Sequence, residues 1–222
     1  MTARPLRLAV LISGRGSNLK AILDAIAAGR LAAQVVLVLS NRPGASGLDI
    51  AAAADLPAAV IDHRQYPDRP AFEQALVSAL DAAQADLLVL AGFMRVLTAD
   101  FVQRYRGRLI NIHPSLLPAF AGLDTHARAL AAGATEHGAS VHFVTAAVDG
   151  GPLIAQIRVP VLADDTPDTL AARVLPAEHR LYPLVIGWYA AGRLALGGDT
   201  VRLDGLPLAA PVQFAATGGL DE

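Results

Sequence analysis

The 222-residue chain contains no cysteine. This absence excludes disulfide bridges, a thiolate nucleophile and cysteine-ligated metal sites. It also agrees with a reducing compartment, so we expect a cytoplasmic protein. Long hydrophobic runs are missing as well, because no apolar stretch reaches the roughly 18 residues that a membrane-spanning helix needs. We therefore expect no membrane partner.

Charge is scarce and nearly balanced. The 18 Lys and Arg residues stand against 20 Asp and Glu residues, which gives a net charge of −2, and there is no long basic run. A nucleic-acid partner is therefore not expected. Hydrophobic residues make up 54% of the chain, which is enough for a substantial core. With no repeat and no dividing linker, we expect a single domain over 1–222.

Short apolar runs alternate with helical patterns through the first half of the chain. Strands are predicted at 6–12, 34–39, 58–61, 86–90 and 109–113, and helices at 19–29, 47–54, 70–83 and 98–105. This alternation predicts an α/β fold with a doubly wound, mostly parallel sheet and a Rossmann-like N-terminal half.

The pattern changes in the second half. A helix is expected at 125–133, alternating strands at 139–144 and 153–159, and a terminal hairpin at 194–203. A long helix is expected from Thr166 to about 192, with Pro176 and Pro183 as candidate kinks or breaks. The C-terminal half therefore extends the sheet with antiparallel strands. The tail at 206–222, above all after Pro211, is expected to be loose.

A glycine loop, 14–18, lies between the first predicted strand and its helix. Backbone N–H groups at such a position, aided by the helix dipole, bind anions. The loop is neither a Walker A motif nor a full G-x-G-x-x-G, because Leu19 occupies the third glycine position. Ser17 and Asn18 would suit a single phosphate, and a simple tight turn is the alternative.

Asn111 and His113 lie two residues apart at the end of a predicted strand. Their side chains therefore point to the same face, and Pro114 ends the strand. An imidazole handles protons near neutral pH, and a carboxamide N–H stabilises an oxyanion. A buried structural histidine beside a strand-end asparagine is the alternative.

Asp149 is the candidate acidic partner. It precedes Gly150-Gly151-Pro152 in a loop, and a carboxylate near His113 would orient the ring and favour its charged form. The residues alone favour an ordinary turn aspartate, since Asp-Gly is a common turn dipeptide.

Three further histidines do not form a recognisable metal motif. His126, His137 and His142 lack the spacing and accompanying acid of a zinc site, so no metal is expected. A hydrolase triad is not expected either, because there is no G-x-S-x-G motif. Glu178 and His179 fit an exposed helix pair or a contact to a ligand hydroxyl.

Five motifs, taken in order, resemble a known family. They are Gly14-Arg15-Gly16-Ser17-Asn18, Ala91-Gly92-Phe93-Met94-Arg95, Asn111-Ile112-His113-Pro114-Ser115-Leu116-Leu117-Pro118, Glu136-His137-Gly138-Ala139-Ser140-Val141-His142 and Asp149-Gly150-Gly151-Pro152. Together they resemble the folate-dependent formyltransferases of purine synthesis that act on glycinamide ribonucleotide, over residues 7–205. Asp124 and Pro176 depart from the family pattern, and Pro176 lies close to Glu178.

The resemblance implies an enzyme that moves a formyl group from 10-formyltetrahydrofolate to the amine of glycinamide ribonucleotide without a metal. It implies a catalytic trio of Asn111, His113 and Asp149. The substrate side is assigned to Gly16, Ser17, Asn18, Leu19, Lys20 and Glu178. The folate side is assigned to Arg69, Met94, Arg95, Val96, Leu97, Asn111, Thr145, Ala146, Ala147, Val148 and Asp149.

The resemblance also divides the single domain into a nucleotide-phosphate-binding half, 1–105, and a catalytic and folate-binding half, 106–205. It is compatible with a monomer or a homodimer. A relative that formylates tRNA is expected to carry a basic face and a further domain, and a folate hydrolase an extra N-terminal domain. An NAD-binding module would need an acid after the second strand, where Ser40-Asn41-Arg42 stands instead.

Overall fold

The computed structural model describes residues 4–216 of the chain. The chain forms two compact units, Met1–Asn111 and Ile112–Glu222. The expectation of one domain over 1–222, with boundaries after residues 105 and 205, stays a prediction.

The first unit is built on parallel strands in the order β5-β4-β1-β2-β3. The strands are β1 (Leu6–Ile12), β2 (Ala33–Ser40), β3 (Ala58–Val60), β4 (Leu87–Leu90) and β5 (Leu109–His113). Leu8 to Ile12 are fully buried, as expected for a strand covered on both faces. The predicted Rossmann-like order is therefore confirmed.

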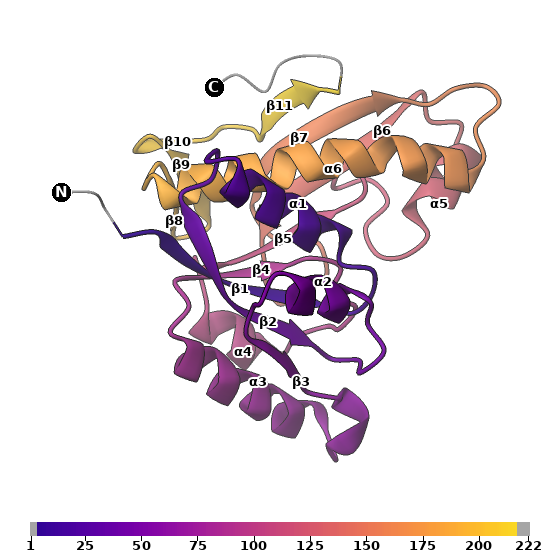
Figure 1. Ribbon diagram of the computed structural model, residues 1–222. Coiled ribbons are helices and arrows are strands. Elements are labelled where there is room, and N and C mark those ends of the chain that lie inside the picture. The colour runs from indigo at the N-terminus through magenta and orange to yellow at the C-terminus, as the bar shows by residue number, and fades with distance from the viewer. Residues whose placement is uncertain (1–3, 217–222) are drawn as a thin grey trace. The chain divides into compact units, whose positions relative to one another are not determined.

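Helices connect these strands. They are α1 (Ser17–Ala27), α2 (Gly47–Ala53), the short 3₁₀ helix η1 (His63–Gln65), α3 (Arg69–Ala83) and α4 (Ala99–Arg104). The Asp68 side chain caps α3 by accepting from the Ala71 amide, and Thr98 caps α4 through the Phe101 amide. Figure 1 shows α1 and α2 on one face of the strands, and α3 and α4 on the other. The carboxyl ends of the strands therefore meet at one edge, where ligands of open α/β sheets bind.

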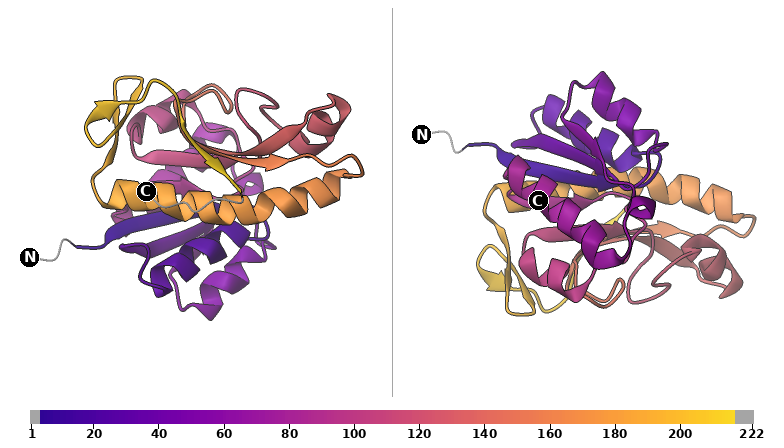
Figure 2. Two further views of the ribbon diagram at one scale, coloured as in Figure 1. Left: turned by 90° about the horizontal axis from the view of Figure 1, so that it is seen from above. Right: turned by 90° about the horizontal axis from the view of Figure 1, so that it is seen from below.

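The second unit contains the predicted antiparallel strands. After α5 (Thr125–Ala131) come β6 (Glu136–Phe143) and β7 (Leu153–Pro160), which pair antiparallel. The long helix α6 (Pro167–Ala190) lies along both strands, as Figures 1 and 2 show. A small antiparallel sheet, β8 (Leu194–Gly197), β9 (Thr200–Leu203) and β10 (Leu206–Pro207), follows.

Helix α6 is continuous through both of its internal prolines, so neither breaks it. Each proline removes one backbone hydrogen bond, which is costly inside a helix. The buried face of α6 supplies the compensation, since Val174, Leu181 and Val185 are fully buried. Tertiary packing, not local propensity, therefore decides the length of this helix.

The prediction of a loose tail is wrong for residues 206–216. Leu206–Pro207 form β10, and β11 (Val212–Ala215) pairs in parallel with β7. The Gln213 side chain fixes β11 further, because its Nε2 donates to Gln156 Oε1 at 2.9 Å. The rest of the predicted tail, 217–222, lies outside the described residues.

Two glycines of the second unit allow backbones to approach closely. A Cβ at Gly138 would lie 1.9 Å from the Ile157 carbonyl oxygen, and a Cβ at Gly151 would lie 1.8 Å from that of Phe143. No side chain fits at such distances, so both positions require glycine.

We therefore expect Gly138→Ala to lower the free energy of unfolding by about 1–3 kcal/mol or more, as overpacking does. Gly44→Ala is the matched control, because a Cβ there meets nothing within 4 Å. Urea unfolding of the two variants measures the difference. Equal stability of the two would contradict the packing argument.

Candidate active site

The carboxyl end of β5 carries the polar pair that the sequence analysis singled out. Ile110 and Ile112 are buried, Asn111 is half-buried and His113 is 6% exposed. The alternation places Asn111 and His113 on one face of the strand. Pro114 then ends the strand, as predicted.

His113 lies between two hydrogen-bond acceptors. Its Nδ1 is 3.4 Å from Asp149 Oδ2, and its Nε2 is 3.1 Å from the Phe120 carbonyl oxygen. A neutral imidazole has one N–H and one lone pair, so it satisfies only one of these neighbours. The protonated ring satisfies both. The geometry of the site therefore favours a positive charge on His113.

Burial opposes that charge. It lowers the pKa of His113 below its usual value, while the Phe120 carbonyl and the Asp149 carboxylate act in the opposite direction. Burial is the largest of these effects, and the ring has both acceptors in place for a proton. This is the behaviour expected of a group that gains charge only during a reaction.

Asp149 is held as a carboxylate by neighbours on three sides. Its Oδ2 accepts from the Gly122 amide at 2.9 Å, and its Oδ1 lies 3.7 Å from His142 Nε2. Burial acts to raise the pKa of Asp149, but His142, the Gly122 amide and His113 together keep it below its usual range. Asp149 itself adopts a left-handed φ of 51°, a conformation that is uncommon outside glycine and worth explaining at a candidate site.

The turn that follows His113 is fixed by buried hydrogen bonds. Ser140 Oγ donates to the Ser115 carbonyl at 2.6 Å and accepts from the Leu117 amide at 3.0 Å. Gln156 Nε2 donates to the Leu117 carbonyl at 2.8 Å. Because these groups are buried and satisfied, they hold the strand end rigidly.

The predicted phosphate loop lies in the first unit, at the start of α1. Gly16 has a left-handed φ of 73°, and a Cβ there would lie 2.6 Å from Gly47 Cα, so only glycine fits. Ser17 is half-buried and Asn18 is 7% exposed, both in the first turn of the helix. The helix N-terminus presents the backbone N–H groups that an anion needs.

Two residues assigned to this loop have other contacts. Leu19 is fully buried, so its side chain belongs to the core and only its amide is available to a ligand. Lys20 is exposed and its amine lies 2.5 Å from Asp24, one helical turn on. An exposed pair of this kind is weak, so a phosphate could replace Asp24 as the partner of Lys20.

Within the first unit, Ser13 joins the ends of three strands. Its Oγ donates to Asn41 Oδ1 at 2.5 Å and accepts from the Met94 amide at 2.8 Å. Glu73 holds the far end of this segment, accepting from the amide of Thr98 at 2.7 Å and from its hydroxyl. The 94–97 segment assigned to folate is therefore anchored at both ends.

The side chains assigned to folate differ in exposure. Met94 is 60% exposed and Val96 48%, whereas Leu97 is buried. Val148, in the loop before Asp149, is 56% exposed. Arg69 is exposed, Arg95 and Thr145 are half-buried, and Ala146 and Ala147 are exposed. Apolar side chains of this exposure are available to an aromatic ligand. Leu97 is a core residue.

Glu178 is buried in α6 and is not part of an exposed helix pair. Asp124, the other departure from the family pattern, precedes α5 with a left-handed φ of 55° and makes no side-chain cap.

Among residues 4–216, no three His, Asp or Glu side chains are grouped as a metal site would need. Nor is any helix in this range long and apolar enough to cross a membrane.

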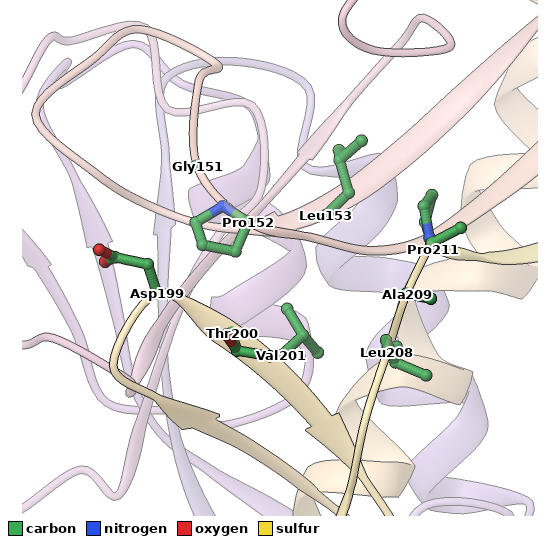
Figure 3. Close-up of a pocket in the computed structure, with 10 residues that line it drawn as sticks. Gly151, Pro152, Leu153, Asp199, Thr200, Val201, Leu208, Ala209 and Pro211 are labelled. Atoms are coloured by element: carbon green, nitrogen blue, oxygen red, sulfur yellow. The ribbon is translucent and has the colours of Figure 1, made fainter.

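A hollow of about 380 Å³ lies elsewhere in the second unit (Figure 3). Its lining residues are Gly151, Pro152, Leu153, Asp199, Thr200, Val201, Leu208, Ala209, Ala210 and Pro211. Asp199 is the one ionisable residue in this lining. None of Asn111, His113 and Asp149 lines this hollow.

His126, which is half-buried, and His137 form a pair with ring centroids 5.1 Å apart. His137 is fully buried, and burial, with a contribution from His126, lowers its pKa to about 4. In the unfolded chain the pKa of a histidine is about 6.5. As the pH falls from 6.5 towards 4, the unfolded chain takes up the proton first, and stability is lost.

We expect the free energy of unfolding to fall by about 2 kcal/mol between pH 7 and pH 5, with His137 the main cause. Urea unfolding at several pH values measures it. In His137→Leu the dependence should flatten, because no histidine there can take up a proton. An unchanged slope in this variant would contradict the assignment to His137.

Sequence reasoning missed His142 and the 119–124 loop, which supply three of the contacts that hold Asp149 and His113. The sequence placed His142 in a family motif and considered it as a metal ligand, but gave it no role beside Asp149. Its place in the same apolar strand as Ser140 was the signal that it is buried. The loop had no such signal, because its contacts are made by backbone atoms.

Comparisons with known proteins show the family of this chain. The formyl transferase family profile matches residues 6–186. Phosphoribosylglycinamide formyltransferase of Escherichia coli (strain K12) is 47% identical over 211 residues, which cover 95% of this chain and 99% of that protein. The structure of phosphoribosylglycinamide formyltransferase from Coxiella burnetii is similar with a TM-score of 0.92 and 53% identity, over 95% of this chain and 99% of that one.

A more distant structure is that of a formyltetrahydrofolate deformylase from Pseudomonas putida KT2440. Its TM-score is 0.81 at 28% identity, over 90% of this chain and 70% of that one. The mixed sheet, the strand-end histidine and these similarities lead to one conclusion: the chain is an enzyme that belongs to the formyl transferase family.

Proposed function

We propose that this enzyme transfers the formyl group of 10-formyltetrahydrofolate to the amine of glycinamide ribonucleotide in purine biosynthesis, with Asn111, His113 and Asp149 as its catalytic residues. The observation that carries the proposal is His113, whose two ring nitrogens face the Asp149 carboxylate and the Phe120 carbonyl at the end of β5. We also propose that it works in the cytoplasm, as a monomer or a homodimer.

In the proposed reaction the amine nitrogen attacks the formyl carbon directly. A carbon–nitrogen bond forms, and the formyl oxygen becomes an oxyanion in a tetrahedral intermediate. The bond from that carbon to N10 of the folate then breaks, and the proton lost by the amine is taken by N10. The proposal requires no covalent bond to the enzyme.

Asn111 and His113 stabilise the oxyanion in this scheme. The carboxamide supplies an N–H donor, and the ring supplies positive charge as it takes up a proton. Asp149 supports that charge, since its carboxylate faces Nδ1. It also aligns the ring and helps to carry the proton from the amine towards N10.

We assign the substrate phosphate to Gly16, Ser17 and Asn18, with the Leu19 amide and the Lys20 amine in support. The supporting observation is the glycine-led N-terminus of α1, an eleven-residue helix. Glu178 is assigned to the ribose hydroxyls. The folate is assigned to the anchored segment 94–97, Arg69, Asn111 and the loop 145–149.

Ser17→Asp tests the phosphate assignment. An acid in the first turn suits the helix dipole, but it repels a phosphate, so we expect the KM for glycinamide ribonucleotide to rise at least about tenfold. The KM for 10-formyltetrahydrofolate serves as the internal control and should change little. Equal effects on both KM values would contradict the assignment.

Water is the alternative acceptor, which would make the enzyme a hydrolase. The two functions are separated by incubating the purified enzyme with 10-formyltetrahydrofolate, with and without glycinamide ribonucleotide. We expect formylated ribonucleotide to form and tetrahydrofolate release to depend on the ribonucleotide. Formate release at the same rate in its absence would overturn the proposed acceptor.

A further inference from the structure

Arg128 does not belong to any site described above, yet its side chain turns back towards the catalytic strand end. It lies on α5, where its Nη1 donates to the Ala121 carbonyl at 2.6 Å and reaches the Leu123 carbonyl at 3.3 Å. Its guanidinium carbon lies 5.8 Å from the centre of the Phe120 ring. One side chain thus contacts three residues of the 119–124 loop.

The same loop holds both members of the catalytic pair. The Phe120 carbonyl faces His113 Nε2 at 3.1 Å, and the Gly122 amide donates to Asp149 Oδ2 at 2.9 Å. Both contacts are made by backbone atoms, so they depend on the conformation of the loop and not on its side chains. A shift of the loop would move both contacts together.

The loop has an unfavourable backbone. Phe120 has a φ of 56° and Asp124 a φ of 55°, and Gly122 between them has a φ of 84°. Left-handed conformations of non-glycine residues persist only where their surroundings determine them strongly. Arg128 supplies such a restraint, because its hydrogen bonds reach carbonyls on either side of Gly122.

We propose that Arg128 is a positioning residue for formyl transfer, which holds the 119–124 loop so that Phe120 and Gly122 stay on His113 and Asp149. The inference rests on the proposed function, because it assumes that these two residues are catalytic. Arg128 contacts neither of them directly. Its charge is the last of several influences that lower the pKa of His113, whereas its hydrogen bonds and its ring contact all go to the loop.

Two variants separate positioning from charge. Arg128→Ala removes the hydrogen bonds, the ring contact and the charge. Arg128→Lys keeps the charge and one compact donor but loses the planar fork. Arg104→Gln is the matched control, since Arg104 is also an exposed arginine, bonded to Asp81 at 2.6 Å and 6.0 Å from the ring centre of Tyr105.

The experiment measures kcat and both KM values of the purified full-length variants, with thermal unfolding of each. We expect Arg128→Ala to lower kcat about 10- to 100-fold, as misplaced catalytic groups do, with both KM values within about threefold of wild type. Arg128→Lys should recover part of kcat. Arg104→Gln should match wild type in every kinetic constant.

A kcat within twofold of wild type in Arg128→Ala overturns the inference, and so does a rise in KM with kcat unchanged. If Arg128→Ala fails to fold, Arg128→Lys decides the question. Lysine lacks the planar guanidinium group, so a wild-type kcat in Arg128→Lys would also overturn the inference. His113→Ala, measured alongside, distinguishes the two failures. An inactive His113 variant with a fully active Arg128→Ala rejects the inference alone, whereas an active His113 variant rejects the catalytic assignment.

Discussion

Replacing His113 with alanine is expected to lower kcat for formyl transfer by about 10³-fold while the protein stays folded. The change removes the ring whose nitrogens face the Asp149 carboxylate and the Phe120 carbonyl at the end of β5. The oxyanion would keep Asn111 as a donor but would lose the positive charge. Steady-state kinetics with both substrates saturating measures the loss, and urea unfolding confirms that the fold is intact.

His113→Gln sharpens this test. Glutamine keeps an N–H donor but cannot take up a proton, so its kcat should stay close to that of the alanine variant. Recovery of most of the activity in His113→Gln would show that hydrogen bonding alone suffices. Near-normal turnover in His113→Ala would remove His113 from the catalytic set.

Asp149→Asn is expected to lower kcat by a similar factor, about 10³-fold. Asparagine has nearly the same shape and retains an oxygen that can accept from the Gly122 amide, so the loop contact is preserved. What it removes is the negative charge beside His113 and His142. The protonated state of His113 then loses its support, and the proton transfer to N10 becomes harder.

The KM values distinguish this effect from damage to the folate loop. If Asp149 acts through charge, kcat falls and both KM values stay close to wild type. If Asp149 only shapes the loop 145–149, the KM for 10-formyltetrahydrofolate rises and kcat changes little. Wild-type kcat in Asp149→Asn would exclude the carboxylate from the chemistry.

Much of the fold could be predicted from local patterns. Strand β4 and the part of β1 from Leu8 to Ile12 are continuous apolar runs, and helices such as α3 and α4 begin after a capping residue. The pair Asn111 and His113 could be predicted as well, because a strand fixes the direction of side chains two residues apart. These features depend on a few neighbouring residues.

Features that depend on distant contacts could not be predicted. β11 is a strand because it pairs with β7. The paired residues are far apart in the sequence, since Gln156 and Gln213 are separated by 57 residues. The loop 119–124 holds His113 and Asp149 close together, and it does so through backbone atoms. The side chains of Leu19 and Leu97 are buried, so they are not available to a ligand. The sequence pattern did not distinguish these two leucines from the exposed residues of their loops.

The titration of His113 tests the central claim, that Asp149 supports the positive charge of this ring. Nuclear magnetic resonance of ¹⁵N-histidine-labelled enzyme measures it, with His113→Ala to assign the signal. We expect the pKa of His113 to lie below its usual value because of burial, and to fall further in Asp149→Asn, where the opposing carboxylate charge is gone. The same pKa in both proteins, or a higher one in Asp149→Asn, would contradict the account.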